Sequence, residues 1–139
     1  MDYKDIKLIV IKTDSTWIER IPYNHFDDEL RIGENFMYNK RTIYKFDDEV
    51  LEWEFRTTKD YYNHKKDFLA ICELVEKIKE NRSWKTCSQY YSIKVYYKSG
   101  RVVEKCYCDN FSEVGMTELR DAILKALPSG CKVYPRFIC

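Results

Sequence analysis

The chain has 139 residues, 24 of them basic and 23 acidic, which gives a formal net charge of +1. This length suits one domain, 1–139, whose core needs no metal or disulfide staple. No apolar run approaches the ~20 residues that span a bilayer, and the first residues lack the basic start of a signal peptide. We therefore expect a cytoplasmic protein. The interspersed charges resemble neither a basic nucleic-acid-binding stripe nor an acidic nucleic-acid mimic.

The first half of the chain predicts an antiparallel meander. Residues 5–13 (DIKLIVIKT) alternate with the period of two that is typical of a strand. One face of this strand is expected to carry Ile9 and Ile11, and the other Ile6, Leu8 and Val10. The elements expected next are a strand over 16–21, a polar linker over 23–29, two short strands within 30–44 with turns at 33–35 and 39–40, and a strand over 50–57.

Residues 60–81 predict the longest helix. Apolar residues recur at helical spacing and form one stripe: Phe68, Ile71, Cys72, Val75 and Ile78. Thr58 is the expected N-cap, and Asn81 the expected terminator.

Residues 90–108 predict a β-hairpin, because apolar and polar residues alternate on both sides of Ser99-Gly100. A two-residue turn places the apolar residues on one face most completely, and we prefer the register that it gives. In this register Lys94 lies opposite Lys105 on the solvent-exposed face. A three-residue turn would instead set Lys94 opposite Glu104, which is a favourable pair.

The last part of the chain predicts a second, shorter helix over 118–127, capped by Thr117. Its apolar stripe is Leu119, Ala122, Ile123 and Ala126. An edge strand is expected within 131–139. Runs of strands punctuated by two helices indicate an α+β fold. We expect an antiparallel sheet, made of the meander and the C-terminal hairpin, with two α-helices packed on one face.

Two acidic clusters could bind a divalent cation through carboxylate oxygens, provided that Asp27, Asp28, Asp47 and Asp48 converge in space. Adjacent aspartates on a strand or turn point in different directions, however, whereas a metal needs convergent ligands. We therefore favour solvated turns, and we expect no metal site.

The six cysteines are expected to be thiols, since no secretion signal accompanies them. Cys106 and Cys108 fall on the buried face in the preferred hairpin register. With Cys131, Cys139 or His25 they could form a zinc site, but a CxC spacing without paired CxxC motifs is a weak zinc signal. Two small core residues are the favoured interpretation.

The sequence contains none of the local motifs that would indicate catalysis or a cofactor. The two histidines, His25 and His64, lie outside any nucleophile signature such as GxSxG. Neither GxGxxG nor GxxxxGK occurs among the four glycines. We expect no enzymatic activity and no cofactor.

The 12 Tyr, 7 Phe and 3 Trp exceed what a core of this size needs, and tyrosine is enriched at protein interfaces. The sequence thus favours a small protein-binding protein, of the inhibitor or immunity type. Its abundance of Lys, Tyr, Ile and Asn suggests a bacterial or phage origin. The candidate contact residues are Tyr38, Tyr44, Tyr61, Tyr62, Tyr96 and Arg136.

Two other functions stay open. A strand face with Tyr and Lys could bind nucleic acid by stacking and charge, and its candidate residues are Lys94, Tyr96, Lys98 and Lys105. A small metal-dependent enzyme, built on the acidic clusters or thiols, is the less favoured alternative. The identity of the partner and the oligomeric state are not readable from the sequence.

Overall fold

A computed structural model describes residues 2–14, 24–47, 50–62, 64–78, 90–108 and 116–127, with side chains described within 2–12, 28–40, 61, 64–78, 92–106 and 117–127. The elements are a 3-10 turn η1 (Tyr3–Asp5), β1 (Ile6–Asp14), β2 (Asn24–Gly33), β3 (Phe36–Asp47), β4 (Val50–Tyr62), α1 (Lys65–Lys77), β5 (Tyr90–Tyr97), β6 (Val102–Cys108) and α2 (Met116–Ala126).

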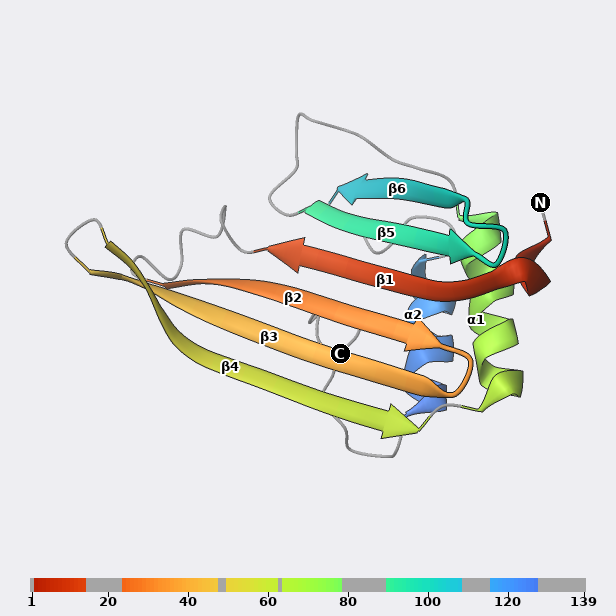
Figure 1. Cartoon of the computed structure of the whole chain (residues 1–139), viewed down its shortest axis with the longest axis horizontal. Coiled ribbons are helices and arrows are strands. Elements are labelled where there is room, and N and C mark those ends of the chain that lie inside the picture. Colours follow the sequence, from red (N-terminus) through yellow and green to blue (C-terminus); the bar gives the residue numbers. More distant parts are fainter. Residues whose placement is uncertain are drawn as a thin grey trace.

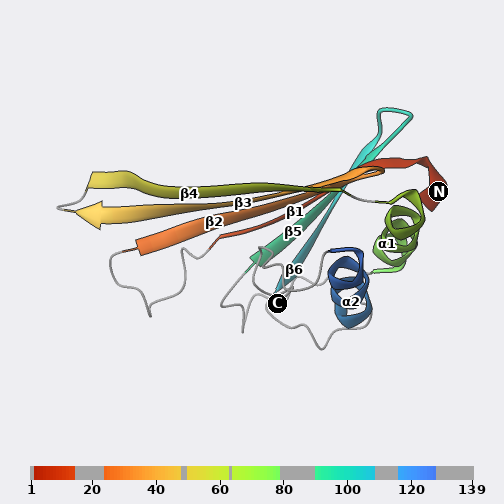
Figure 2. The same ribbon diagram turned by 90° about the horizontal axis from the view of Figure 1, so that it is seen from below.

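The strands form one antiparallel sheet in the order β4-β3-β2-β1-β5-β6 (Figure 1). The meander β2–β4 and the hairpin β5–β6 therefore flank β1, which lies between them. Both helices lie on the same side of the sheet and run across the strands (Figure 2). The α+β class that the sequence predicts is confirmed.

The two helices cover only part of one face. The 12 and 13 residues of β3 and β4 extend about 40 Å. Each helix is about 10 Å wide, so the pair covers about half of that length. We call the covered face the inner face. Its buried strand residues are Ile9, Ile11, Leu30, Ile32, Met37, Tyr61, Ile93, Val95 and Tyr97.

A β-bulge changes the expected faces of β1. Ile9 and Ile11 share the inner face, as predicted. Ile6 was expected beside Leu8 and Val10, but it lies in the buried core. The ladder to β5 pairs Ile6 with Tyr97 and Leu8 with Tyr96, which leaves Lys7 as an extra residue. Such an insertion shifts the following alternation by one position.

The predicted apolar stripe of α1 is confirmed, since all five of its members are buried. The helix begins later than expected because β4 continues to Tyr62. Thr58 is therefore a strand residue, and His64 stands at the N-cap position. The C-cap is Ile78. In α2, Thr117 lies inside the helix rather than before it, and Leu119 and Ile123 are buried as the stripe predicts.

The meander differs from the prediction in two places. The expected linker over 23–29 is strand from Asn24 onward, and the expected turn at 39–40 lies in the middle of β3. The reason is a continuous ladder that pairs 24–32 with 37–45. The expected strand over 16–21, the terminator Asn81 and the expected tail strand within 131–139 lie outside the described residues.

The hairpin takes the register that we did not prefer. Lys94 pairs with Glu104, and Ile93 pairs with Lys105. The Tyr97 N–H donates to the Arg101 carbonyl over 2.9 Å, which closes a three-residue loop. Gly100 has a φ of 94° there, the left-handed conformation that such loops need and that glycine adopts without strain.

This register carries Lys105 to the inner face, where it caps α1. Its ammonium donates to the carbonyl oxygens of Ile78 (2.8 Å), Val75 (2.9 Å) and Glu76 (3.4 Å). The last carbonyls of a helix have no partner within the helix and carry the negative end of its dipole. In addition, the Tyr97 hydroxyl donates to the Glu76 carboxylate over 3.0 Å. The hairpin thus holds the end of α1 on the sheet.

We predict that Lys105→Met lowers the free energy of unfolding by about 1–3 kcal/mol, because the helix carbonyls lose a charged donor. Urea denaturation measures this change. Lys94→Met on the same hairpin is the matched control, with an expected change within about 0.5 kcal/mol. Equal losses for the two variants would contradict the cap.

Candidate binding surface

The other face of the sheet, which we call the outer face, has no helix packed on it in the described part of the chain (Figure 2). The strand registers arrange its residues in three rows across β6, β5, β1, β2 and β3. The apolar row is Val102, Tyr96, Leu8, Gly33 and Phe36. The central row is Glu104, Lys94, Val10, Arg31 and Tyr38. The charged row is Cys106, Ser92, Lys12, Glu29 and Lys40.

The apolar row exposes large side chains. Val102 is 46% exposed and Phe36 is 40% exposed, while Tyr96 and Leu8 are half-buried. The ring of Phe36 lies against Gly33, where a Cβ atom would overlap it. The absence of a side chain at Gly33 therefore lets the phenyl ring lie flat on the sheet.

Glu29 pairs with one cation of the central row and one of the charged row. Its carboxylate lies 3.1 Å from Nε of Arg31 and 3.3 Å from Nζ of Lys12. Burial alone would raise the pKa of Glu29, but the hydrogen bonds and charges of Arg31 and Lys12 outweigh it and hold that pKa below 4.5. At neutral pH the Glu29 carboxylate is therefore ionised and fixes both cations.

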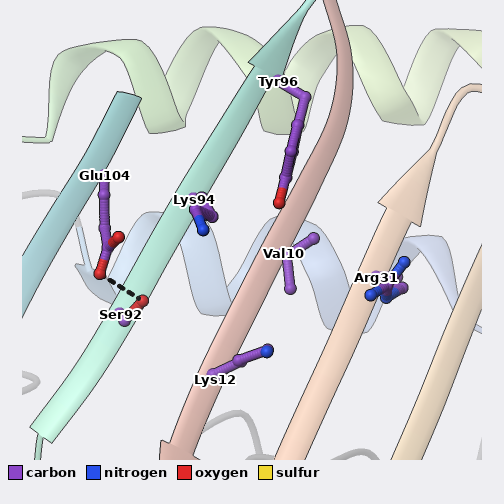
Figure 3. A pocket seen from close by; sticks show the side chains of 7 residues that line it. All are labelled: Val10, Lys12, Arg31, Ser92, Lys94, Tyr96 and Glu104. Carbon is purple, nitrogen blue, oxygen red and sulfur yellow. Dashed lines mark hydrogen bonds between the residues drawn. The ribbon is translucent and has the colours of Figure 1, made fainter. Parts of the chain in front are cut away.

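A shallow depression of about 190 Å³ lies over β1 between β5 and β2 (Figure 3). Its lining residues are Val10, Lys12, Arg31, Ser92, Lys94, Tyr96 and Glu104. On its rim, the Ser92 hydroxyl donates to Glu104 over 3.4 Å. Pockets that enclose small molecules commonly measure about 300–1,000 Å³, so this depression suits one side chain of a partner better than a whole metabolite.

The structure separates the predicted partner-contact residues. Tyr38 and Tyr96 lie half-buried on the outer face. Tyr61 is only 8% exposed and belongs to the core, so it is not a surface residue. Tyr44 and Tyr62 lie on β3 and β4, but their side chains are not described. Arg136 lies outside the described residues.

The predicted nucleic-acid residues do not form one surface. Lys94 and Tyr96 share the outer face, and Lys98 is exposed in the hairpin loop. Lys105 points to the inner face and binds the end of α1. The expected platform therefore loses one of its four members.

The acidic clusters do not converge in the sheet. Asp27 pairs with Thr42, whereas Asp47 stands five positions further along β3, about 16 Å away. Asp28 is 1% exposed in the middle of β2, so the favoured interpretation as a solvated turn is wrong for this cluster. Asp48 lies outside the described residues.

The structure also differs from the expected positions of the thiols. Cys106 is half-buried on the outer face rather than inside, because of the hairpin register. The side chains of Cys108 and His25 are not described, and Cys131 and Cys139 lie outside the described residues. Within the described part of the chain, no three His, Cys, Asp or Glu side chains are grouped for a metal ion.

Sequence reasoning missed Lys12, Glu29 and Arg31. Glu29 was assigned to the end of a linker and Arg31 to the start of a separate short strand, so their common face with Lys12 was not recognised. The alternation in Glu29-Leu30-Arg31-Ile32 was the available signal, since it has the period of a half-buried strand.

Comparison of the chain with protein-family models, curated proteins and solved structures finds no match. None of the described helices is both long and apolar enough to cross a membrane.

The ion pairs of Glu29 predict that the stability of the protein depends on pH. The lowered pKa of Glu29 contributes stability above the ordinary pKa of a glutamate, and this contribution is lost as the pH falls through the folded-state value. Carboxyl-carbon NMR titration should give Glu29 a pKa below 4.5. Arg31→Met should raise the pKa of Glu29, because one fewer cation then opposes the effect of burial. A pKa unchanged by this substitution would contradict the ion pair.

Cys72 should be inert in the native protein. It is fully buried, and burial raises the pKa of its thiol to about 12, so roughly 10⁻⁴ of it is thiolate at a pH of about 8. We predict that iodoacetamide labels Cys106 before Cys72, and labels Cys72 only after unfolding in guanidinium chloride. Peptide mass spectrometry reads both sites. Equal native labelling would contradict the burial of Cys72.

Proposed function

We propose that the protein is a small, non-enzymatic binding protein that docks on another protein through its outer face. The observation that carries this proposal is the apolar row, which lies beside the central and charged rows on a sheet face that none of the described helices covers. Small size and the absence of catalytic motifs in the sequence favour an inhibitor or immunity-type factor. The composition favours a bacterial or phage source and action in the cytoplasm.

The composition of the outer face supports a protein partner. Interfaces combine an aromatic and aliphatic centre with a polar rim, and exposed apolar patches commonly mark interaction sites. Strand and row spacings give the three rows an area of roughly 500 Å². One side of a standard interface measures about 800 Å², so these rows supply more than half of it.

Nucleic acid is the second candidate, favoured by the cations of the outer face. Lys12, Arg31, Lys40 and Lys94 share this face with Tyr38 and Tyr96, and aromatic residues among cations can stack on bases. Glu29 and Glu104 lie among these cations, however, and would repel a phosphate backbone. We therefore place the protein partner first.

We predict that Val102→Glu reduces capture of the partner at least tenfold, because it places a charge in the apolar row. Capture from host lysate with nuclease, read by quantitative mass spectrometry, measures this loss. Leu124→Glu is the matched control, since Leu124 is 36% exposed on α2 and lies away from the outer face.

The two variants together test the surface. Loss of a stoichiometric protein with Val102→Glu, but not with Leu124→Glu, is the expected result. Equal capture by both variants would reject the outer face as the docking surface. Recovery of nuclease-sensitive material alone, with affinity falling steeply as salt rises, would favour nucleic acid instead.

A further inference from the structure

The depression on the outer face has an apolar floor between two cations. Val10 is 3% exposed and forms the floor. Lys94 is its register partner on β5, and Arg31 is its register partner on β2. Since neighbouring strands lie about 4.8 Å apart, the two cations stand on either side of one side-chain-sized space. The Tyr96 hydroxyl points along β1 toward this space (Figure 3).

Glu29 holds Arg31 in place, and both Arg31 and Lys94 keep N–H donors outside the described ion pairs. Arg31 uses Nε for Glu29, which leaves the N–H donors of its two terminal nitrogens outside that pair. In the part of the chain that the structure describes, Lys94 forms no ion pair. An anion between Lys94 and Arg31 would therefore gain two charged donors without breaking the pairs of Glu29.

From this geometry we propose that the depression receives a side-chain carboxylate of the partner protein, with an apolar side chain of the partner seated on the apolar row. This inference rests on the proposed function and adds the chemistry of the partner. The apolar and central rows lie about 6.8 Å apart along the strands, which is the spacing of residues i and i+2 in an extended chain. The recognised element is therefore an extended segment with an apolar residue two positions from an acidic one.

Two features favour a carboxylate over a phosphate. Glu104 lies on the rim of the depression and Glu29 is paired with Arg31, so the dianion of a phosphate monoester would meet more repulsion than a carboxylate. The adjoining apolar row, with Val102 and Phe36, offers contact to aliphatic groups, which a phosphate backbone lacks. A nucleic-acid ligand is therefore an outcome of the test rather than the proposal.

The test uses acetyl-Leu-Ser-Glu-Ser-amide as the probe, and the same peptide with Gln in place of Glu as its uncharged control. Amide NMR titration of the full chain should shift the signals of Val10, Arg31, Lys94 and Tyr96 with the Glu peptide. We expect the Gln peptide and the Lys94→Met variant each to weaken binding by roughly threefold, which is the size of a partly exposed ion pair. Lys98→Met, which removes an exposed loop cation, should leave the affinity unchanged.

Each contrary result has a definite meaning. Equal binding of the Glu and Gln peptides would overturn the carboxylate site, as would signals that shift only outside the depression. Tighter binding of oligothymidylate than of the Glu peptide would assign the surface to nucleic acid. If a captured protein depends on Val102 but not on Lys94, the docking surface stands and only the carboxylate inference fails. If no protein is captured, the proposed function fails independently of the peptide result.

Discussion

The register of the β5–β6 hairpin is the constraint on which both faces of the sheet depend. A three-residue loop with Gly100 in the left-handed conformation fixes it, and a slip of one residue would move every β6 side chain to the opposite face. In the observed register Lys105 reaches the carbonyls at the end of α1, while Glu104 lies on the outer face opposite Lys94. One turn therefore determines both a structural cap and the side chains that β6 contributes to the outer face.

The inner face of the sheet carries the hydrophobic core, and the outer face carries ordered charged side chains. On the inner face, aliphatic and aromatic residues of five strands join the apolar stripes of α1 and α2 in one buried cluster, which supplies most of the driving force for folding. The outer face has its own order, since Glu29 fixes Lys12 and Arg31 next to the floor residue Val10. Side chains that are already fixed lose less entropy when a partner binds, so this ordering favours recognition.

Sequence patterns predict those parts of the fold where periodicity and burial agree. The strand over β1, both helical stripes and the α+β class follow from regular spacing of apolar residues. Patterns fail where tertiary contacts reverse local preference, as at Asp28, which is polar and yet buried in β2. They also fail at Lys105, because a lysine on the inner face is explained only by the helix end above it. The sequence analysis identified Tyr38, Lys94 and Tyr96 of the candidate surface. Which residues lie beside them on neighbouring strands could be known only from the strand register.

Carbene footprinting of the protein with and without its captured partner tests the central claim, that the outer face is the docking surface, most directly. Mass spectrometry then gives the labelling of each residue in both states. We expect the partner to protect Phe36, Tyr96 and Val102 and to leave the labelling of Leu124 on α2 unchanged. Protection confined to the helices, with the outer face labelled equally in both states, would contradict it.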